Sequence, residues 1–129
     1  DNPIDGGESR GRDLSTEEEC LIEACGNQLM LFRLRGPMSF GAAKGISSRM
    51  GLVSNYKVLI LDISEVPRMG VTAALALERM VQEAEALGRL PFVAGANQRL
   101  QERLEKFGVT AVMTTRLDAL ERAKTHLAQ

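Results

Sequence analysis

A short, uninterrupted apolar run near the middle of the chain constrains the fold most. Residues 58–61 read Val-Leu-Ile-Leu and lie between Lys57 and Asp62. An apolar run of this length, without alternating polar residues, is typical of a strand that is covered on both faces. Because helices cover both faces of parallel sheets, the run predicts an α/β fold built on a mostly parallel sheet.

Strand and helix signals alternate on both sides of this run. Short apolar segments bounded by turn residues predict two further strands, at residues 90–95 and 109–113. Apolar residues at helical spacing predict four helices: residues 38–55, 72–87, 98–107 and 116–127. The expected N-caps are Asn97 and Thr115, and the expected stops are Gly88 and Gly108.

The segment from Cys20 to Arg35 carries two apolar-rich runs separated by Gly26-Asn27, a pair suited to a tight turn. It therefore predicts an N-terminal β-hairpin. A second interpretation stays open, because Ser15-x-x-Glu18 has the form of a capping box and would start a short helix that ends at Cys25. The resulting fold class is α/β: a mixed, mostly parallel sheet of about four to five strands, an N-terminal hairpin and about four to five packing helices.

Charge is distributed unevenly along the chain. Residues 1–23 carry eight acidic side chains against two arginines, although the formal net charge of the whole chain is only −1. We expect residues 1–19 to be a flexible acidic leader or linker and residues 20–129 to form one domain. A net charge near zero gives no electrostatic reason to expect a nucleic acid as partner.

The candidate binding site follows the central strand, because ligands of open α/β sheets bind beyond the carboxyl ends of the strands. Four residues there are candidates for a phosphate, ligand or regulatory site: Asp62, Ser64, Gly70 and Thr72. Amides at the start of the helix would favour an anion near Thr72. The alternative is structural: Thr72 caps the helix and Asp62 binds loop amides.

Enzyme signatures are missing from the sequence. It has one histidine, two cysteines, no nucleophile elbow and no glycine-rich phosphate loop followed by Lys and Ser or Thr. We therefore expect no catalytic residue, no metal site and no cofactor.

Two ordered motifs resemble the STAS domain at the cytoplasmic C-terminus of SulP anion transporters. The first, FRLRGPMSFGAA, contains Gly36, Pro37 and Phe40. The second, VLILDISEVPRMGVTAALALE, contains Val66 and Pro67 after the strand that ends at Asp62. The resemblance covers about residues 20–127 and implies the STAS fold of sheet and helices.

The resemblance implies a non-catalytic regulatory and dimerisation domain of a sulfate or bicarbonate transporter, on the cytoplasmic side of the plasma membrane. The implied partners are the transmembrane domain of the same protein, a second copy, and a regulatory protein or nucleotide. Two alternatives remain: a soluble anti-sigma factor antagonist that binds an anti-sigma kinase, and a module that binds a nucleotide or small anion. The antagonists carry Asp-Ser-Ser-Gly at the helix start, where this chain has Gly70, Val71, Thr72 and Ala73, so only the hydroxyl of Thr72 remains.

Overall fold

The fold is a five-stranded sheet whose strands follow one another in sequence order. It comes from a computed structural model that describes residues 3–5, 14–35, 45, 48, 55–109 and 112–128. The strands are β1 (Pro3–Asp5), β2 (Leu29–Arg35), β3 (Val58–Glu65), β4 (Leu90–Ala94) and β5 (Val112–Thr114). β1 pairs antiparallel with β2, and every later pair is parallel.

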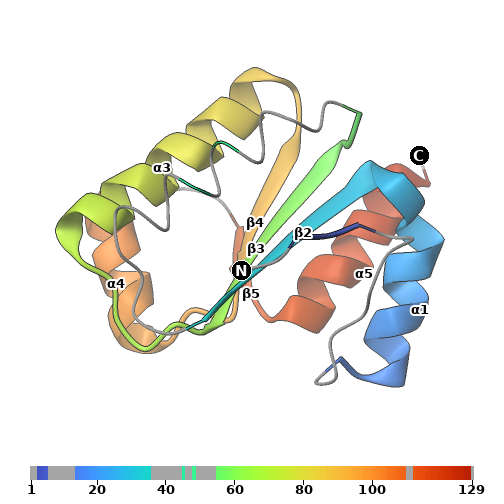
Figure 1. Cartoon of the computed structure of the whole chain (residues 1–129), viewed down its shortest axis with the longest axis horizontal. Helices are drawn as coiled ribbons and strands as arrows, with labels where there is room; N and C mark the ends of the chain where they lie inside the picture. The colour runs from blue at the N-terminus through green and yellow to red at the C-terminus, as the bar shows by residue number, and fades with distance from the viewer. Residues whose placement is uncertain are drawn as a thin grey trace.

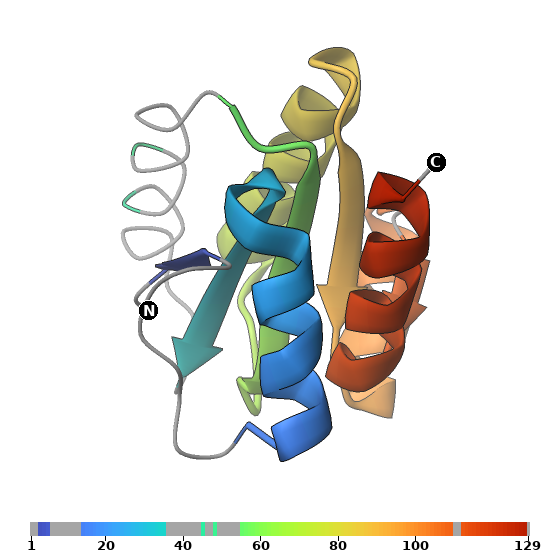
Figure 2. The same cartoon turned by 90° about the vertical axis from the view of Figure 1, so that its right-hand side faces the viewer.

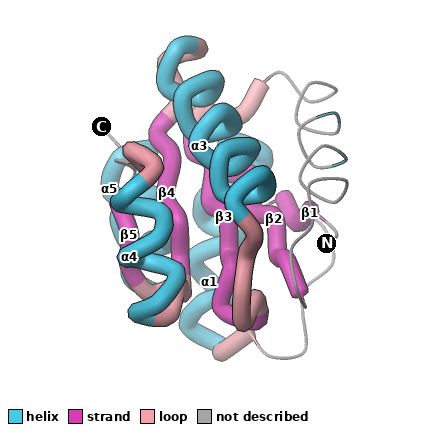
Figure 3. The backbone as a smooth tube through the Cα atoms, turned by 90° about the vertical axis from the view of Figure 1, so that its left-hand side faces the viewer, coloured by secondary structure: helices cyan, strands magenta, loops and turns pink. Residues whose placement is uncertain are grey.

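Helices lie on both faces of this sheet (Figure 1). One face carries α1 (Thr16–Cys25) and α5 (Arg116–Leu127), which stand in front of the strands in Figure 2. The opposite face carries α3 (Val71–Ala86) and α4 (Gln98–Lys106), which stand in front in Figure 3. The prediction of an α/β fold with a mostly parallel sheet is confirmed.

Alternation along the two central strands creates two separate cores. Leu29, Leu31, Val58 and Ile60 face α1 and α5 and are fully buried with Phe92. The residues between them face α3 and α4, and their cluster holds Met30, Phe32, Leu34, Leu59, Leu61 and Ile63. Apolar residues at both parities are what a sheet covered on both sides requires.

Most of the expected helix ends are confirmed. Asn97 accepts a hydrogen bond from the Leu100 amide (2.8 Å), and Thr115 accepts one from the Asp118 amide (3.1 Å), as N-caps do. Gly88 and Gly108 follow the C-caps of α3 and α4 with positive φ. Within the described part of the chain, no helix is long and apolar enough to cross a membrane.

The predicted hairpin between Cys20 and Arg35 is wrong. Its first half is helix α1, and Gly26 is the C-cap of that helix, with φ 62°. The capping box of the second interpretation is present, because Ser15 Oγ accepts from the Glu18 amide (3.0 Å) and a Glu18 carboxylate oxygen accepts from the Ser15 amide (2.9 Å). These reciprocal bonds satisfy two amides at the start of α1, so they favour the helix over a strand.

The structure also differs from the expected domain boundary and from the expected end of the helix over residues 72–87. The boundary expected between residues 19 and 20 falls inside α1, and the short strand β1 lies within the expected leader. Leu87, the last residue of the helix expected over 72–87, is the C-cap of α3 and is 63% exposed. Gly36, Pro37 and Phe40 lie outside the described residues, as does most of the helix expected over 38–55.

Gly95, just after β4, packs directly against the end of β3. Its φ is 81°, and a Cβ at this position would lie 2.5 Å from Ser64 Cβ and 2.8 Å from Ser64 Cα. Both the conformation and the space therefore require glycine. We predict that Gly95→Ala lowers the free energy of unfolding by about 2 kcal/mol or more in urea titrations.

Gly88→Ala is the matched control, because Gly88 also has a positive φ (78°) but nothing lies within 4 Å of its added Cβ. This variant isolates the conformational term, which we expect to be about 1 kcal/mol. Equal losses in the two variants would show that the contact with Ser64 has no energetic consequence.

Candidate functional site

Two charged residues interrupt the apolar rows on the α1/α5 face of the sheet. Arg33 continues the row of Leu29 and Leu31 on β2, and Asp62 continues the row of Val58 and Ile60 on β3. Arg33 and Asp62 are paired neighbours across the parallel strands, and they are only 6% and 2% exposed. Their nearest ion-pair atoms, Arg33 Nε and Asp62 Oδ2, are 3.8 Å apart. A buried ion pair of this kind requires further hydrogen bonds to offset the loss of hydration.

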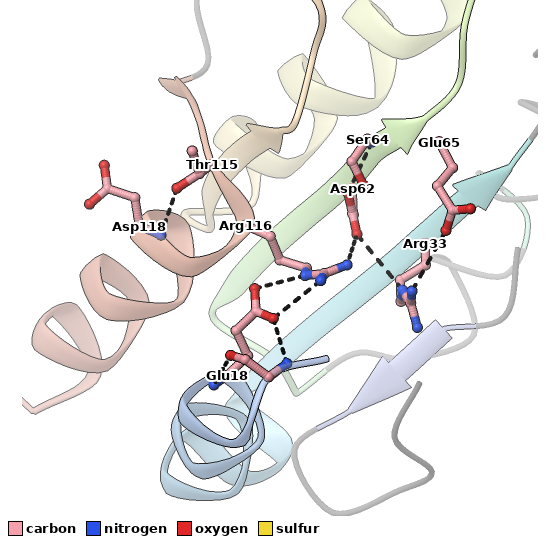
Figure 4. A network of polar contacts seen from close by, with 9 residues as sticks. Glu18, Arg33, Asp62, Ser64, Glu65, Thr115, Arg116 and Asp118 are labelled. Carbon is pink, nitrogen blue, oxygen red and sulfur yellow. Dashed lines mark hydrogen bonds and ion pairs between the residues drawn. The ribbon is translucent and has the colours of Figure 1, made fainter. Parts of the chain in front are cut away.

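Arg116, the first residue of α5, supplies those hydrogen bonds. Its Nη1 donates to Asp62 Oδ2 (2.9 Å), while Nε and Nη2 donate to the two carboxylate oxygens of Glu18 (2.9 and 3.1 Å). Figure 4 shows the guanidinium between the two carboxylates, with Asp62 coming from the sheet and Glu18 from α1. The planar, forked guanidinium suits this double role, because it donates to a carboxylate in bidentate fashion and still has donors left.

Glu18 itself has two functions. The oxygen that accepts from Arg116 Nη2 also accepts from the Ser15 amide, so one carboxylate both caps α1 and attaches it to α5. Glu18 is 6% exposed, although it lies in the first turn of a helix. The start of α1 is thereby held against the start of α5.

The second oxygen of Asp62 is also occupied. Asp62 Oδ1 accepts from the amide and the hydroxyl of Ser64 (3.0 and 2.7 Å), which closes a turn at the end of β3. Beyond it, Glu65 Oε2 lies 3.9 Å from Arg33 Nη2, and half of the Glu65 side chain is exposed. We name this set, Glu18, Arg33, Asp62, Glu65 and Arg116, the carboxyl-edge network.

The pKa values within the network follow from this geometry. Burial raises the pKa of Glu18, but hydrogen bonds from Arg116 and Ser15 and the charge of Arg116 outweigh it, so the net pKa lies below 4.5. For the cation Arg116 burial has the opposite effect and lowers the pKa, but the hydrogen bonds and charges of Glu18 and Asp62 outweigh it, so the net pKa is raised. The pair is therefore ionised at neutral pH.

The structure brings together only half of the residues predicted for the site. Asp62 and Ser64 are hydrogen-bonded on the α1/α5 face. Gly70 and Thr72 are exposed at the start of α3, which packs on the other face (Figure 1). Gly70, and not Thr72, is the N-cap, and it makes no side-chain cap bond.

The Val66-Pro67 motif has a structural function. Val66 is 2% exposed in the core beneath α3, and its amide donates to the Ile63 carbonyl (3.0 Å). The Pro67 carbonyl accepts from Asn97 Nδ2 (3.3 Å), so the loop after β3 is attached to the N-cap of α4.

Sequence reasoning missed Arg116 and the connection to Glu18. In the sequence, Glu18 stands out only as part of a possible capping box with Ser15. A usable signal was present in the strands, because Arg33 and Asp62 each occupy an otherwise apolar row of the same face. Two opposite charges at the same end of neighbouring buried strands predict a pair, and buried pairs require additional partners.

The lowered pKa of Glu18 makes stability depend on pH in a defined direction. In the unfolded chain Glu18 binds its proton at higher pH than in the folded chain, so its contribution is complete above about pH 4.5 and is lost as pH falls through the lowered value. We predict that the free energy of unfolding decreases as the pH is lowered from about 4.5. We also expect a shallower fall in Glu18→Gln, which keeps an acceptor for the Ser15 amide but does not titrate.

Urea titrations at several pH values, on both proteins, measure this difference directly. Other carboxylates contribute to both curves and cancel in the comparison. Parallel curves for the two proteins would contradict the prediction, since they would mean that Glu18 titrates alike in the folded and unfolded chains.

Comparisons with known proteins agree with the motifs. A family model for the STAS domain matches residues 22–122. Two curated relatives, each a bicarbonate transporter BicA, are 38% identical over 96 residues (Synechocystis sp.) and 41% identical over 93 residues (Picosynechococcus sp.). These alignments cover 74% and 72% of this chain but only 17% and 16% of the relatives.

Solved structures give the same result. The SulP transporter STAS domain from Vibrio cholerae has a TM-score of 0.74 at 29% identity and covers 89% of this chain and 100% of that one. The anti-sigma factor antagonist SpoIIAA, at 14% identity and a TM-score of 0.64, shares the fold over 76% of this chain and 90% of its own. The family model covers more than half of the chain, including β2, β3 and the start of α5, and the chain belongs to the STAS domain family.

Proposed function

We propose that this chain is the cytoplasmic, non-catalytic STAS domain of a SulP-type anion transporter. One observation carries the proposal: about three-quarters of the chain aligns at 38–41% identity with bicarbonate transporters, of whose length it spans about one-sixth. That proportion is expected of one domain attached to a much larger protein. By the same likeness we propose bicarbonate as the transported anion.

A supporting role fits the chemistry of the site better than catalysis does. Both oxygens of Asp62 and both oxygens of Glu18 accept hydrogen bonds from other groups of the domain. Carboxylates held in this way are poor general bases, because the oxygens that would take a proton already accept hydrogen bonds within the domain. Among the described residues, no group of three or more His, Cys, Asp or Glu side chains is placed to hold a metal ion.

We propose two partners, the transmembrane domain of the same protein and a second copy of the chain. In the first role the domain supports folding and regulation of the membrane part, and in the second it contributes to a homodimer. The anion-transporter structure of murine Slc26a9, which covers 76% of this chain at 18% identity and a TM-score of 0.64, shares the fold within a larger protein.

One observation favours a second candidate function. Thr72 is exposed in the first turn of the 16-residue helix α3, where a phosphate would be stabilised by the helix amides. By the resemblance stated above, Thr72 corresponds to the second serine of the antagonists' Asp-Ser-Ser-Gly motif, the serine that is phosphorylated in that family. A partner that binds the start of α3 and is released when Thr72 is phosphorylated would make the chain an anti-sigma factor antagonist.

The first proposal is tested by measuring transport by the full-length protein that contains this chain. We predict that deleting residues 14–128 lowers the uptake of labelled bicarbonate and the amount of dimer in the membrane at least several-fold, because the membrane part loses a folded support. The measurements are uptake by whole cells, membrane abundance by immunoblot and oligomeric state by crosslinking.

A chimera is the matched control, in which the aligned segment of the Synechocystis relative, 38% identical, replaces the deleted residues. It should restore uptake and dimer. Unchanged uptake, abundance and dimer after the deletion would overturn the proposal. Phosphorylation of the chain by an anti-sigma kinase, abolished in Thr72→Ala, would establish the second candidate in its place.

A further inference from the structure

Helix α1 buries few apolar side chains, as does α4, which buries Leu100 and Leu104. Of its ten residues only Glu18, Ile22 and Cys25 are buried, and only two of these are apolar. The 16-residue helix α3, in contrast, buries six apolar side chains against the other face of the sheet. Elements with few buried apolar side chains open at lower free energy than the core around them.

The carboxyl-edge network attaches α1 to α5 and, through Arg116, to the sheet. Glu18 bonds to Arg116 in bidentate fashion, and Arg116 in turn bonds to Asp62 on β3 (Figure 4). Glu18, Ile22 and Cys25 are spaced i, i+4 and i+7, so the charged contact lies at one end of the buried stripe and Cys25 at the other. The network therefore fixes the start of α1, next to Leu14, which is 8% exposed in the same apolar core.

The charges of the network allow α1 to leave without disturbing the sheet. When Glu18 moves into water, Asp62 keeps its bond to Arg116 and its 3.8 Å pair with Arg33. No buried carboxylate loses its partners, which is the costly outcome when a buried pair is broken. The chain after α1 also has a suitable hinge, because Gly26 has a positive φ (62°) and nothing lies within 4 Å of where its Cβ would be.

We propose that α1 is a releasable strap, held by the Glu18–Arg116 pair, that detaches from the α1/α5 face while the rest of the domain stays folded. Its release uncovers part of an apolar row that α1 and α5 together bury fully in the closed form: Leu29, Leu31, Val58 and Ile60. The strap is a property of this chain by itself and does not depend on which anion the larger protein transports.

The thiol of Cys25 reports the release. Cys25 is 4% exposed at the end of α1, whereas Cys20 is exposed, so Cys20→Ser leaves a single buried thiol in the chain. The rate at which iodoacetamide alkylates Cys25 is measured by mass spectrometry, once under native conditions and once in urea, where the chain is unfolded. The ratio of the native rate to the rate in urea gives the opening constant. Circular dichroism during urea titration gives the constant for global unfolding. We expect the opening constant of Cys25 to exceed the global constant at least tenfold.

Two variants separate the strap from the rest of the fold. Glu18→Gln keeps the capping acceptor for Ser15 but weakens the charged contact with Arg116, so alkylation of Cys25 should accelerate about five- to tenfold. Gly88→Ala destabilises the domain at the end of α3, on the opposite face of the sheet from α1 (Figure 1). It should raise the global unfolding constant and leave the alkylation rate of Cys25 unchanged.

Arg122→Met is the matched surface control. It removes an exposed arginine from the same helix as Arg116, where Arg122 Nε lies 3.9 Å from Asp118 Oδ2, and it should change neither constant. The proposal is overturned if Cys25 reacts no faster than global unfolding permits. It is equally overturned if Gly88→Ala accelerates both processes by the same factor, or if Glu18→Gln leaves alkylation unchanged.

Discussion

The guanidinium of Arg116 is the contact on which the carboxyl edge of this domain depends. It lies between a carboxylate of the sheet and a carboxylate of α1, at 2.9 Å from each. Removing it would leave both acids with too few donors in a water-poor environment, a much larger penalty than the loss of a surface pair. Helices that meet through one charged centre acquire a fixed relative position that apolar packing alone specifies less strictly. In this domain the centre joins the first described helix, the last helix and the middle of the sheet.

The architecture could be predicted from sequence because its signals are local. The run at residues 58–61 requires two covered faces, and Asn97 and Thr115 start helices through bonds to amides three residues away. The network could not be predicted in the same way. Arg116 bonds to Asp62 across 54 residues and to Glu18 across 98, and no spacing rule connects positions so far apart.

The hairpin prediction failed for an identifiable reason. Gly26 suits the first position of a tight turn, yet its positive φ serves a helix C-cap equally well. The residues on either side of it did not decide between the two, because Leu21, Ile22 and Cys25 suit a covered strand or one helix face. The capping box of Ser15 and Glu18 favours the helix, and the long-range bonds between Glu18 and Arg116 hold it against α5. Similarly, Gly70 and Thr72 are close to Asp62 in sequence but belong to an element on the opposite face.

The lengths of the strands also matter for how this domain meets other proteins. The seven- and eight-residue strands β2 and β3 are interior, whereas the two edge strands, β1 and β5, have three residues each. A long open edge offers a row of backbone donors and acceptors that a strand of another molecule can extend. Edges this short offer very few, so the sheet is a poor template for continuous growth from one molecule to the next. Recognition through side chains on the helices is favoured instead, and copies of the domain at high local concentration are thereby protected from polymerising through their sheets.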